Sequence, residues 1–434
     1  MNYFGRAEEL LTRTSPVSTC GYVTDITGLI IEGSGPAVGI GTTCTIVQDS
    51  RRIAAQVVGF RKGSILLMSF DDVYGIAPGA TIISQGEISK VLVSRELLGH
   101  VIDPLGKPLD SALPLTVGSE VPVFQNPPSP LKRDRIEEVF DVGIKAVNSI
   151  LSIGKGQRVA IMAGSGVGKS TFLSMIAKHS KSSINVIALV GERGREVREF
   201  IERDLGVEGL ARSVIVTATS DSSALLRIRA GFVATAIAEY FRDQGEDVCL
   251  MLDSITRFCM AQREIGLAVG EPPSTNGYTP SVFALLPKLL ERAGCKAGAG
   301  SITAFYTVLV EGDDLNEPIA DAVRGILDGH IVLSRALANA GHYPAIDVLQ
   351  SVSRVMTDIV PIEKITLAQE TRKVLADYKA IEDLVTAGAY KEGQNKSADY
   401  ALAHIEEVQE FLKQKPLEAY NVGQADELLS KVFK

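Results

Sequence analysis

The sequence lacks the features of a membrane-spanning, secreted or disulfide-stabilised protein. No apolar run approaches the roughly 18–20 residues that a membrane-spanning helix needs. Residues 1–9 contain no basic segment followed by an apolar one, so we expect no signal peptide. The five cysteines form no C-x-x-C pair and have no metal-ligand spacing, which favours reduced, mostly buried thiols. We therefore expect a cytoplasmic protein.

An excess of positive charge is also lacking. The chain carries 44 Lys and Arg residues against 52 Asp and Glu residues, for a net charge of −8 at pH 7. This balance argues against a protein whose affinity comes from a broad basic face, and we expect no nucleic-acid partner. The sequence has no long internal repeat and no low-complexity tail. With 434 residues, 45% of them hydrophobic, it is long enough for two or three domains.

The first 85 residues favour a small β domain. Short apolar or alternating segments, rich in Val, Ile and Thr, are separated by glycine-bearing turns at close intervals, at 21–31, 43–48, 53–60, 64–69 and 80–83. This texture is typical of a small antiparallel barrel or sandwich. Prolines are frequent between Pro104 and Pro130, so we expect residues 86–135 to be a connection with little regular structure.

Residues 136–360 have the texture of an α/β domain. Short apolar runs recur at 158–162, 185–190, 213–218, 248–252, 302–310 and 331–333, with helical patterns between them such as 224–242 and 281–293. Apolar strands that alternate with helices indicate a mostly parallel sheet covered on both faces. Residues 361–434 show helical periodicity alone, which predicts a C-terminal helical domain.

Residues 163–171, with the sequence AGSGVGKST, are the most informative stretch. They follow an apolar run and precede a helical pattern, which is the order that a phosphate-binding loop requires. Glycines let backbone N–H groups converge on phosphate oxygens, and the helix N-terminus adds partial positive charge. The first position of the usual pattern is Ala163 rather than glycine, a minor departure because small size is what matters there. The predicted phosphate-binding residues are Gly164, Ser165, Gly166, Val167, Gly168, Lys169, Ser170 and Thr171.

Two of these residues have roles that follow from the chemistry of the motif. Lys169 is expected to reach the β- and γ-phosphates, and the Ser170 hydroxyl is expected to bind Mg²⁺. Asp253, directly after the apolar run 248–252, is a candidate for the carboxylate that orients the metal or its waters. The alternative for Asp253 is that it caps the next helix. The sequence therefore predicts binding of a nucleoside triphosphate with Mg²⁺.

Hydrolysis needs further groups, and spacing does not choose among the candidates. Glu192 and Glu311 both follow predicted strands, and either carboxylate could orient the attacking water. Each could equally be in a surface ion pair. Four arginines could stabilise the charge on the transferred phosphoryl group: Arg193, Arg195, Arg257 and Arg354. Tyr343 could stack on adenine, although an interior or hinge tyrosine is the ordinary interpretation.

Several segments taken together resemble the hexameric ATPases of type III protein export, flagellar and injectisome alike, which are related to the catalytic subunit of the rotary ATP synthases. Residues 191–200, 252–258 and 351–354 resemble the family's segments around the catalytic centre. The stretches 270–294 and 311–331 resemble the parts that separate export ATPases from their rotary relatives. The resemblance covers nearly the whole chain, and Ala163 fits the family's form of the loop.

The resemblance implies a role for each candidate residue. Glu192 would be the general base, with Arg193 beside it as a second catalytic residue and Glu311 in a sensing role. Arg354 would be the arginine finger, donated to the site of a neighbouring subunit, and Tyr343 would contact adenine. The central domain would be a RecA-like P-loop ATPase domain that hydrolyses ATP with Mg²⁺.

The resemblance also implies partners. It implies a homohexamer with active sites between subunits, export chaperones and cargo, stalk and regulator proteins, and peripheral association with an inner-membrane export apparatus. The segment ahead of the barrel is short, so we expect part of the family's regulator-binding or membrane-binding segment to be missing. Two alternatives stay open: an RNA-translocating ring ATPase of the transcription-terminator type, and a non-catalytic nucleotide-binding ring subunit.

Overall fold

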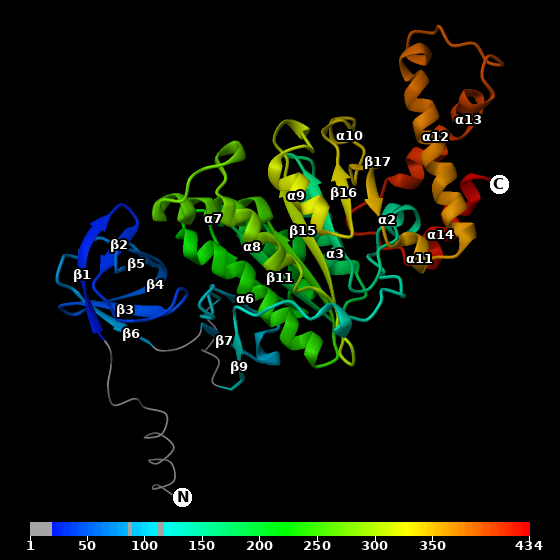
Figure 1. The fold of residues 1–434 in the computed structure, drawn as a ribbon. Coiled ribbons are helices and arrows are strands. Elements are labelled where there is room, and N and C mark those ends of the chain that lie inside the picture. The colour runs from blue at the N-terminus through cyan, green and yellow to red at the C-terminus, as the bar shows by residue number, and fades with distance from the viewer. Residues whose placement is uncertain (1–19, 86–88, 111–116) are drawn as a thin grey trace, which may run out of the picture.

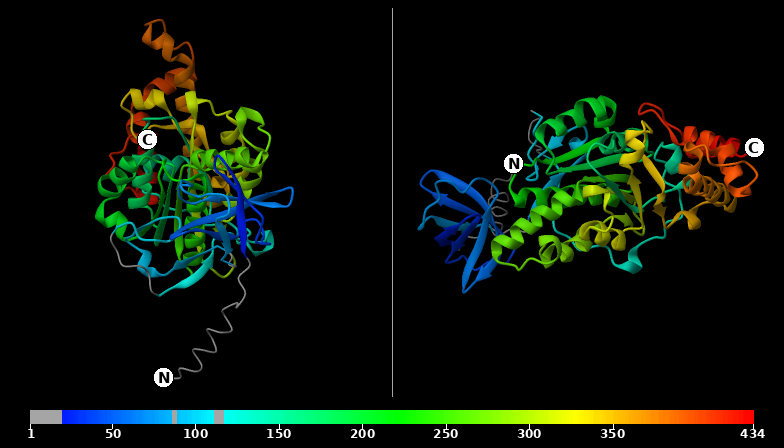
Figure 2. Two further views of the ribbon diagram at one scale, coloured as in Figure 1. Left: turned by 90° about the vertical axis from the view of Figure 1, so that its left-hand side faces the viewer. Right: turned by 90° about the horizontal axis from the view of Figure 1, so that it is seen from above.

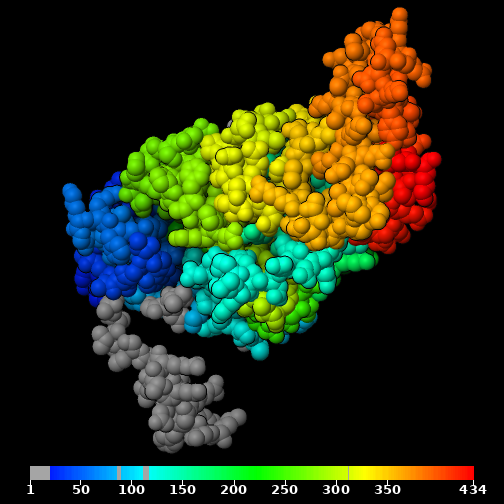
Figure 3. Space-filling view, turned by 45° about the vertical axis from the view of Figure 1, so that its right-hand side comes forward, coloured from blue at the N-terminus to red at the C-terminus, as the bar shows by residue number. Residues whose placement is uncertain are grey.

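The computed structural model describes residues 20–85, 89–110 and 117–434. Within them a barrel, a central sheet covered by helices, and a group of C-terminal helices follow one another across the molecule (Figure 1). The right-hand view in Figure 2 and the space-filling view in Figure 3 show the barrel and the C-terminal helices at opposite ends of the central part. The segment ahead of the barrel, for which we expected a shortened binding region, lies outside the described residues.

The N-terminal part is a closed antiparallel barrel, as predicted. Its strands are β1 (Cys20–Thr27), β2 (Ile30–Gly33), β3 (Thr43–Gln48), β4 (Arg51–Arg61), β5 (Ser64–Ser69) and β6 (Thr81–Ser84). The strand order is β1-β2-β5-β4-β3-β6, and β6 closes the barrel against β1. The segment 21–31 is two strands instead of one, because Gly28 adopts a φ of 60° and makes the turn between them.

The connection after the barrel has more regular structure than expected. It contains β7 (Lys90–Val93), β8 (Val101–Ile102) and β9 (Ser119–Pro122), with short 3₁₀ turns at Arg95–Leu97 and Pro130–Lys132. Strands β7 and β9 pair with each other, and β8 joins the edge of the central sheet. Two-residue and four-residue strands give too short a pattern to stand out among prolines. The domain boundaries at 85, 135 and 360 remain predictions.

The central sheet confirms the predicted α/β class. Its strands are β10 (Arg158–Ala163), β11 (Ile184–Val190), β12 (Ser213–Ala218), β13 (Asp247–Asp253), β14 (Gly294–Cys295), β15 (Ser301–Leu309), β16 (Gly329–Leu333) and β17 (Ile346–Ser353). The order is β17-β16-β10-β15-β13-β11-β12-β8, with β14 beside β15. All pairs are parallel except those of β17 and β14. The parallel strands therefore all end at the same edge of the sheet.

Helices cover both faces of this sheet. They are α2 (Lys145–Ile150), α3 (Lys169–His179), α4 (Gly194–Glu199), the π-helical segment Phe200–Leu205, α5 (Gly206–Ala211), α6 (Ala224–Asp243), α7 (Ile255–Val269), α8 (Pro280–Leu290), α9 (Pro318–Ile326) and α10 (Arg335–Asn339). Further 3₁₀ turns lie at Thr275–Gly277 and Glu311–Asp313. Successive residues of β10 alternate between two cores: Ala160 and Met162 pack with α6 to α9, whereas Val159 and Ile161 pack with α2 and α3.

The C-terminal part is helical, as predicted. It consists of α11 (Met356–Ile359), α12 (Ile362–Thr386), α13 (Lys396–Leu412) and α14 (Val422–Val432). Helices α12 and α13 pack against each other and extend away from the sheet (Figure 1). Helix α14 packs on α2, which ties this part to the central domain. Within the described part of the chain, none of the helices combines the length and the apolar character needed to cross a membrane.

Candidate active site

The glycine-rich stretch forms the turn from β10 into α3. Gly166 and Gly168 have φ values of 79° and 91°, a left-handed conformation that glycine adopts without a steric penalty. Gly168 is the N-cap of α3, and no side chain caps the first amides of this helix. Those N–H groups are therefore available to a ligand, and the helix dipole favours an anion there. The local structure is that of a phosphate-binding loop.

A cavity of about 750 Å³ opens over this loop. All the predicted loop residues line it except Val167, which is buried beside a neighbouring cavity. Glu192 and Arg193, at the end of β11, line the opposite wall. Gly191 has a φ of 72°, and a Cβ atom there would lie 2.8 Å from the Arg257 side chain. A glycine is therefore needed for Glu192 to follow the strand at this position.

Three predicted residues meet at the base of the cavity. The Lys169 Nζ atom lies 2.5 Å from Asp253 Oδ1 and 3.3 Å from Glu192 Oε1. Asp253 Oδ1 also accepts a hydrogen bond of 2.7 Å from the Thr307 hydroxyl, on β15. Strands β10, β13 and β11, with β15 between the first two, place these groups together because all of them end at the same edge of the sheet. Sequence reasoning predicted this meeting.

The two carboxylates lie in different electrostatic surroundings. Burial raises the pKa of Glu192 to about 7; the Lys169 ammonium opposes this shift and the Asp253 carboxylate adds to it. Burial acts to lower the pKa of Lys169, but the charges of Asp253 and Glu192 outweigh it and leave the pKa raised. Lys169 therefore keeps its charge, while Glu192 exchanges a proton near neutral pH. A carboxylate with that property is suited to general base catalysis.

Asp253 does not cap the next helix. The N-cap of α7 is Ser254, whose side chain accepts a hydrogen bond from the Arg257 N–H group. The Asp253 side chain instead points to Lys169 and Thr307 and is buried. The structure thus rules out the capping alternative and leaves the carboxylate bound to Lys169, which lines the cavity.

Oxygen donors for Mg²⁺ are present at this base. Ser170 lines the cavity and is exposed, so it offers a hydroxyl oxygen, and Asp253 offers a carboxylate. Both are hard oxygen ligands of the kind that Mg²⁺ prefers. In the part of the chain that the structure describes, no group of three or more His, Cys, Asp and Glu side chains is placed to hold a metal alone. The donor set fits a Mg²⁺ ion that arrives with nucleotide phosphates and takes its other ligands from phosphate and water.

The candidate arginines divide between two places. Arg193 and Arg257 line the cavity, and the Arg257 Nε atom is buried with no hydrogen-bond partner. Arg193 is 80% exposed and is paired with Glu196. Arg195 is exposed on α4 and is paired with Glu199. The structure therefore favours Arg193 and Arg257 over Arg195 as groups that act on a ligand of the same chain.

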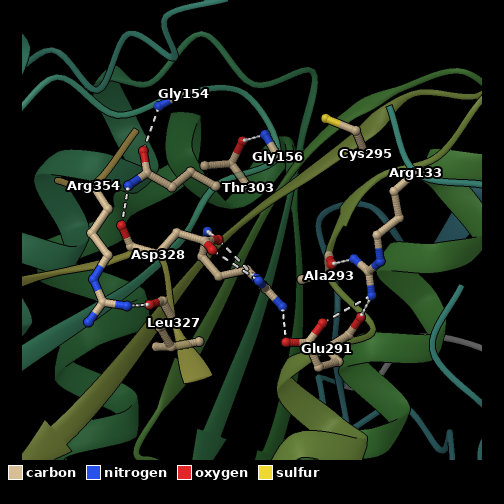
Figure 4. Close-up of polar contacts among 12 residues, drawn as sticks. Arg133, Gly154, Gly156, Glu291, Ala293, Cys295, Thr303, Leu327, Asp328 and Arg354 are labelled. Carbon is tan, nitrogen blue, oxygen red and sulfur yellow. Dashed lines mark hydrogen bonds and ion pairs between the residues drawn. The ribbon is translucent and has the colours of Figure 1, made fainter. Parts of the chain in front are cut away.

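Arg354 lies at the opposite edge of the sheet. It follows β17, and its N–H group donates to the Asp328 carbonyl. Its guanidinium donates to the carbonyl of Leu327 (Figure 4) and to that of Arg324, both at the C-terminal end of α9. Asp328 in turn is bound through its carboxylate to Arg158, the first residue of β10. The loop follows the last residue of β10, and six residues of extended strand separate the two edges by about 20 Å. Arg354 is therefore out of reach of the cavity in its own chain.

Tyr343 borders a second cavity, of about 290 Å³, on the other side of the loop. A Cβ atom on Gly168 would lie 3.4 Å from the Tyr343 ring. Gly168 and Thr171 line both cavities, so the two are parts of one site. Phe172, Pro344, Gln414 and Pro416 complete an apolar space suited to a flat base.

Sequence reasoning missed several residues of the site. Thr307 binds Asp253, Arg335 and Gly312 line the phosphate cavity, and Gln414 lines the Tyr343 cavity. A signal existed for Arg335, because it comes two residues after the predicted strand 331–333, at the edge where ligands bind. Thr307 and Gln414 have no local signal. The Glu311 side chain is outside the described part of the structure.

Comparisons with known proteins match three parts of the chain to family models. Residues 143–353 match the ATP synthase alpha/beta family, nucleotide-binding domain. Residues 23–86 match the beta-barrel domain of that family, and residues 360–431 match the T3SS EscN ATPase C-terminal domain.

Individual relatives cover nearly the whole chain. The chain is 54% identical to the flagellum-specific ATP synthase of Bacillus subtilis over 94% of its length and 93% of that protein. It is 48% identical to the type 3 secretion system ATPase of Xanthomonas euvesicatoria, over 91% of its length and 89% of that protein. The solved structure of the assembled ATPase EscN from the enteropathogenic E. coli type III secretion system has a TM-score of 0.90 and 44% identity, covering 95% of this chain and all of that one.

The fold, the phosphate-binding loop with its two carboxylates and these similarities lead to one conclusion: the chain is an ATP-hydrolysing enzyme that belongs to the family of flagellum-specific and type III secretion ATPases.

Proposed function

We propose that the chain hydrolyses Mg·ATP at a site between subunits of a ring and that this hydrolysis serves type III protein export. The observation that carries the proposal is that two carboxylates, Asp253 and Glu192, bind Lys169 in the wall of the phosphate cavity. A site that only held nucleotide would have no need of a second, proton-exchanging carboxylate.

Each residue has a role in the proposed reaction. Lys169 and the free amides at the start of α3 hold the phosphates, while Ser170 and Asp253 hold Mg²⁺. When bound, the metal ion neutralises charge on the phosphate oxygens. Glu192 orients the attacking water and accepts its proton. Arg193 and Arg257 add positive charge at the wall of the cavity. Tyr343 packs on the base in the adjoining cavity.

The remaining positive charge is proposed to come from another subunit. The distance of Arg354 from its own cavity is consistent with this, since an arginine held there does not reach the phosphates bound by its own chain. An assembled structure exists for the related ATPase EscN, which supports a ring of identical subunits here, six by the family resemblance. A further solved structure shows EscN in complex with its central stalk EscO, which supports a stalk partner for this chain.

The proposed use of the hydrolysis is export of protein cargo. Flagellum-specific and type 3 secretion relatives at 44–54% identity support coupling of ATP hydrolysis to export of protein cargo. Release of cargo from chaperones, regulator proteins, cytoplasmic location and peripheral association with a membrane apparatus remain predictions from the family resemblance.

A turnover assay tests the catalytic part of this proposal. We expect the purified chain to release phosphate from ATP in the presence of Mg²⁺ and to lose this activity when the ion is chelated. Lys169→Ala should abolish both turnover and tight nucleotide binding, since it removes the ammonium that the phosphates need. Tight ATP binding without turnover in the wild type would instead favour a non-catalytic ring subunit.

The pKa of Glu192 predicts the pH dependence. A carboxyl group with its pKa raised to about 7 is protonated below neutral pH and cannot then accept a proton from water. We therefore expect kcat/KM, which reports on the free enzyme, to rise with pH and to reach half of its plateau near pH 7. The residual activity of Glu192→Gln should lack this inflection. A wild-type profile that is flat or falls between pH 6 and 8 would contradict the assignment of Glu192 as the base.

A further inference from the structure

A second cation stands directly beside the phosphate-binding loop. Arg335 is the first residue of α10 and follows β16, the neighbour of β10 in the sheet. Its side chain therefore lies at the same edge as the loop, where it lines the phosphate cavity. It is 46% exposed, so water and ligands reach it.

Arg335 touches the first glycine of the loop. A Cβ atom on Gly164 would lie 2.6 Å from Arg335 Nη2 and 2.8 Å from Asp313 Oδ1. Both contacts are with the far ends of flexible side chains, so they place the Arg335 guanidinium and the Asp313 carboxylate directly against Gly164. The guanidinium and the carboxylate are thus packed on the backbone that would bind phosphate.

The partner of Arg335 is exchangeable. Arg335 Nε donates to Asp313 Oδ2 over 3.2 Å, and both side chains are 46% exposed. Exposed ion pairs of this kind contribute little net free energy. Asp313 sits in a short turn after β15, in which Gly312 and Asp313 have φ values of 62° and 60°. Aspartate is among the non-glycine residues that adopt this left-handed conformation most often.

A triphosphate in the cavity would compete for the same guanidinium. Lys169 is already bound by the carboxylates of Asp253 and Glu192, whereas Arg335 is paired, within the described residues, with the carboxylate of a surface turn. A phosphate group carries more charge than a carboxylate and matches the fork of donors on arginine. Since the cavity is partly enclosed, the new contact would also be less screened by water than the old one.

We propose that Arg335 is a phosphate-binding residue of this site: when ATP binds, it exchanges the Asp313 carboxylate for an oxygen of the terminal phosphate and releases the turn at 311–313. This inference rests on the proposed function, because it needs ATP in the same cavity. Asp313 is then a competitor of the nucleotide and not a ligand. Substitutions of the two residues of this ion pair should consequently change the affinity for ATP in opposite directions.

The test is equilibrium binding of a non-hydrolysable ATP analogue and of ADP, both with Mg²⁺, measured by titration calorimetry. We expect Arg335→Ala to weaken binding of the analogue about 10-fold and to leave ADP binding within about 2-fold, because only the analogue has the third phosphate. Asp313→Asn should tighten binding of the analogue about 3-fold, since it frees the guanidinium. The double variant should behave like Arg335→Ala.

Controls separate this inference from a structural effect and from failure of the proposed function. Arg61→Ala removes an ion pair of similar exposure in the barrel and should leave both affinities unchanged. The proposal would be overturned if Arg335→Ala lost equal affinity for the analogue and for ADP, or if Asp313→Asn bound the analogue more weakly. An ion pair that only stabilises the loop would make both substitutions weaken binding. If wild type and Lys169→Ala bind nucleotide equally, the proposed function fails instead.

Discussion

Glu192→Gln is expected to lower kcat for ATP hydrolysis by about 100-fold to 10,000-fold, the usual contribution of a general base, while ATP still binds. Gln has nearly the shape of Glu but accepts no proton from the attacking water. Because the Lys169 ammonium and the amides of the loop remain, the phosphates keep their main contacts. The measurements are steady-state phosphate release and the affinity for a fluorescent ATP analogue.

A matched variant makes this result specific. Glu199→Gln is the same chemical change at the last residue of α4, where the carboxylate is paired with Arg195 on the surface. It should retain nearly full activity, since surface pairs contribute little. A similar loss in both variants would point to a general disturbance of the segment after β11. Near-normal turnover in Glu192→Gln would move the base to another group.

Arg354→Ala is expected to reduce kcat about 1,000-fold or more, the usual contribution of an arginine finger, without abolishing ATP binding. The side chain is held by carbonyls at the end of α9, at the far edge of the sheet from its own loop. The loss should therefore appear only in assembled protein. Wild-type activity per subunit should climb with protein concentration, whereas the variant should stay slow throughout.

Mixing two inactive variants tests whether Arg354 acts on a neighbour. Arg354→Ala retains a complete phosphate cavity, and Lys169→Ala retains the finger. Random assembly of equal amounts places an intact cavity against an intact finger in about one interface of four, so about a quarter of wild-type activity should return. The control is a mixture of Lys169→Ala with Arg198→Ala, a substitution on the surface of α4. Its ATPase activity should not exceed the value expected when active subunits are diluted with inactive ones. No recovery in the first mixture would mean that the finger does not act between subunits.

Much of the fold and of the site followed from local sequence patterns. The six apolar runs of the central domain are strands of one sheet, and the glycine-rich loop lies between β10 and α3. Asp253 and Glu192 could be placed near Lys169 because the ends of parallel strands meet at one edge. By contrast, β8 and β17 were not predicted. A two-residue strand and a half-exposed edge strand lack a continuous apolar pattern.

The sequence by itself determined the order of the main strands and helices, the phosphate-binding loop and the acids that follow neighbouring strands, because these depend on short-range periodicity and on glycine. The tertiary structure decided the rest. It excluded Asp253 as a helix cap, gave Asp253 a hydrogen bond from Thr307, and buried Glu192 until its pKa approached neutrality. It also put Arg354 at the far edge of the sheet and Arg335 on Gly164. These properties depend on distances and burial between strands far apart in the chain, and no local pattern contains them.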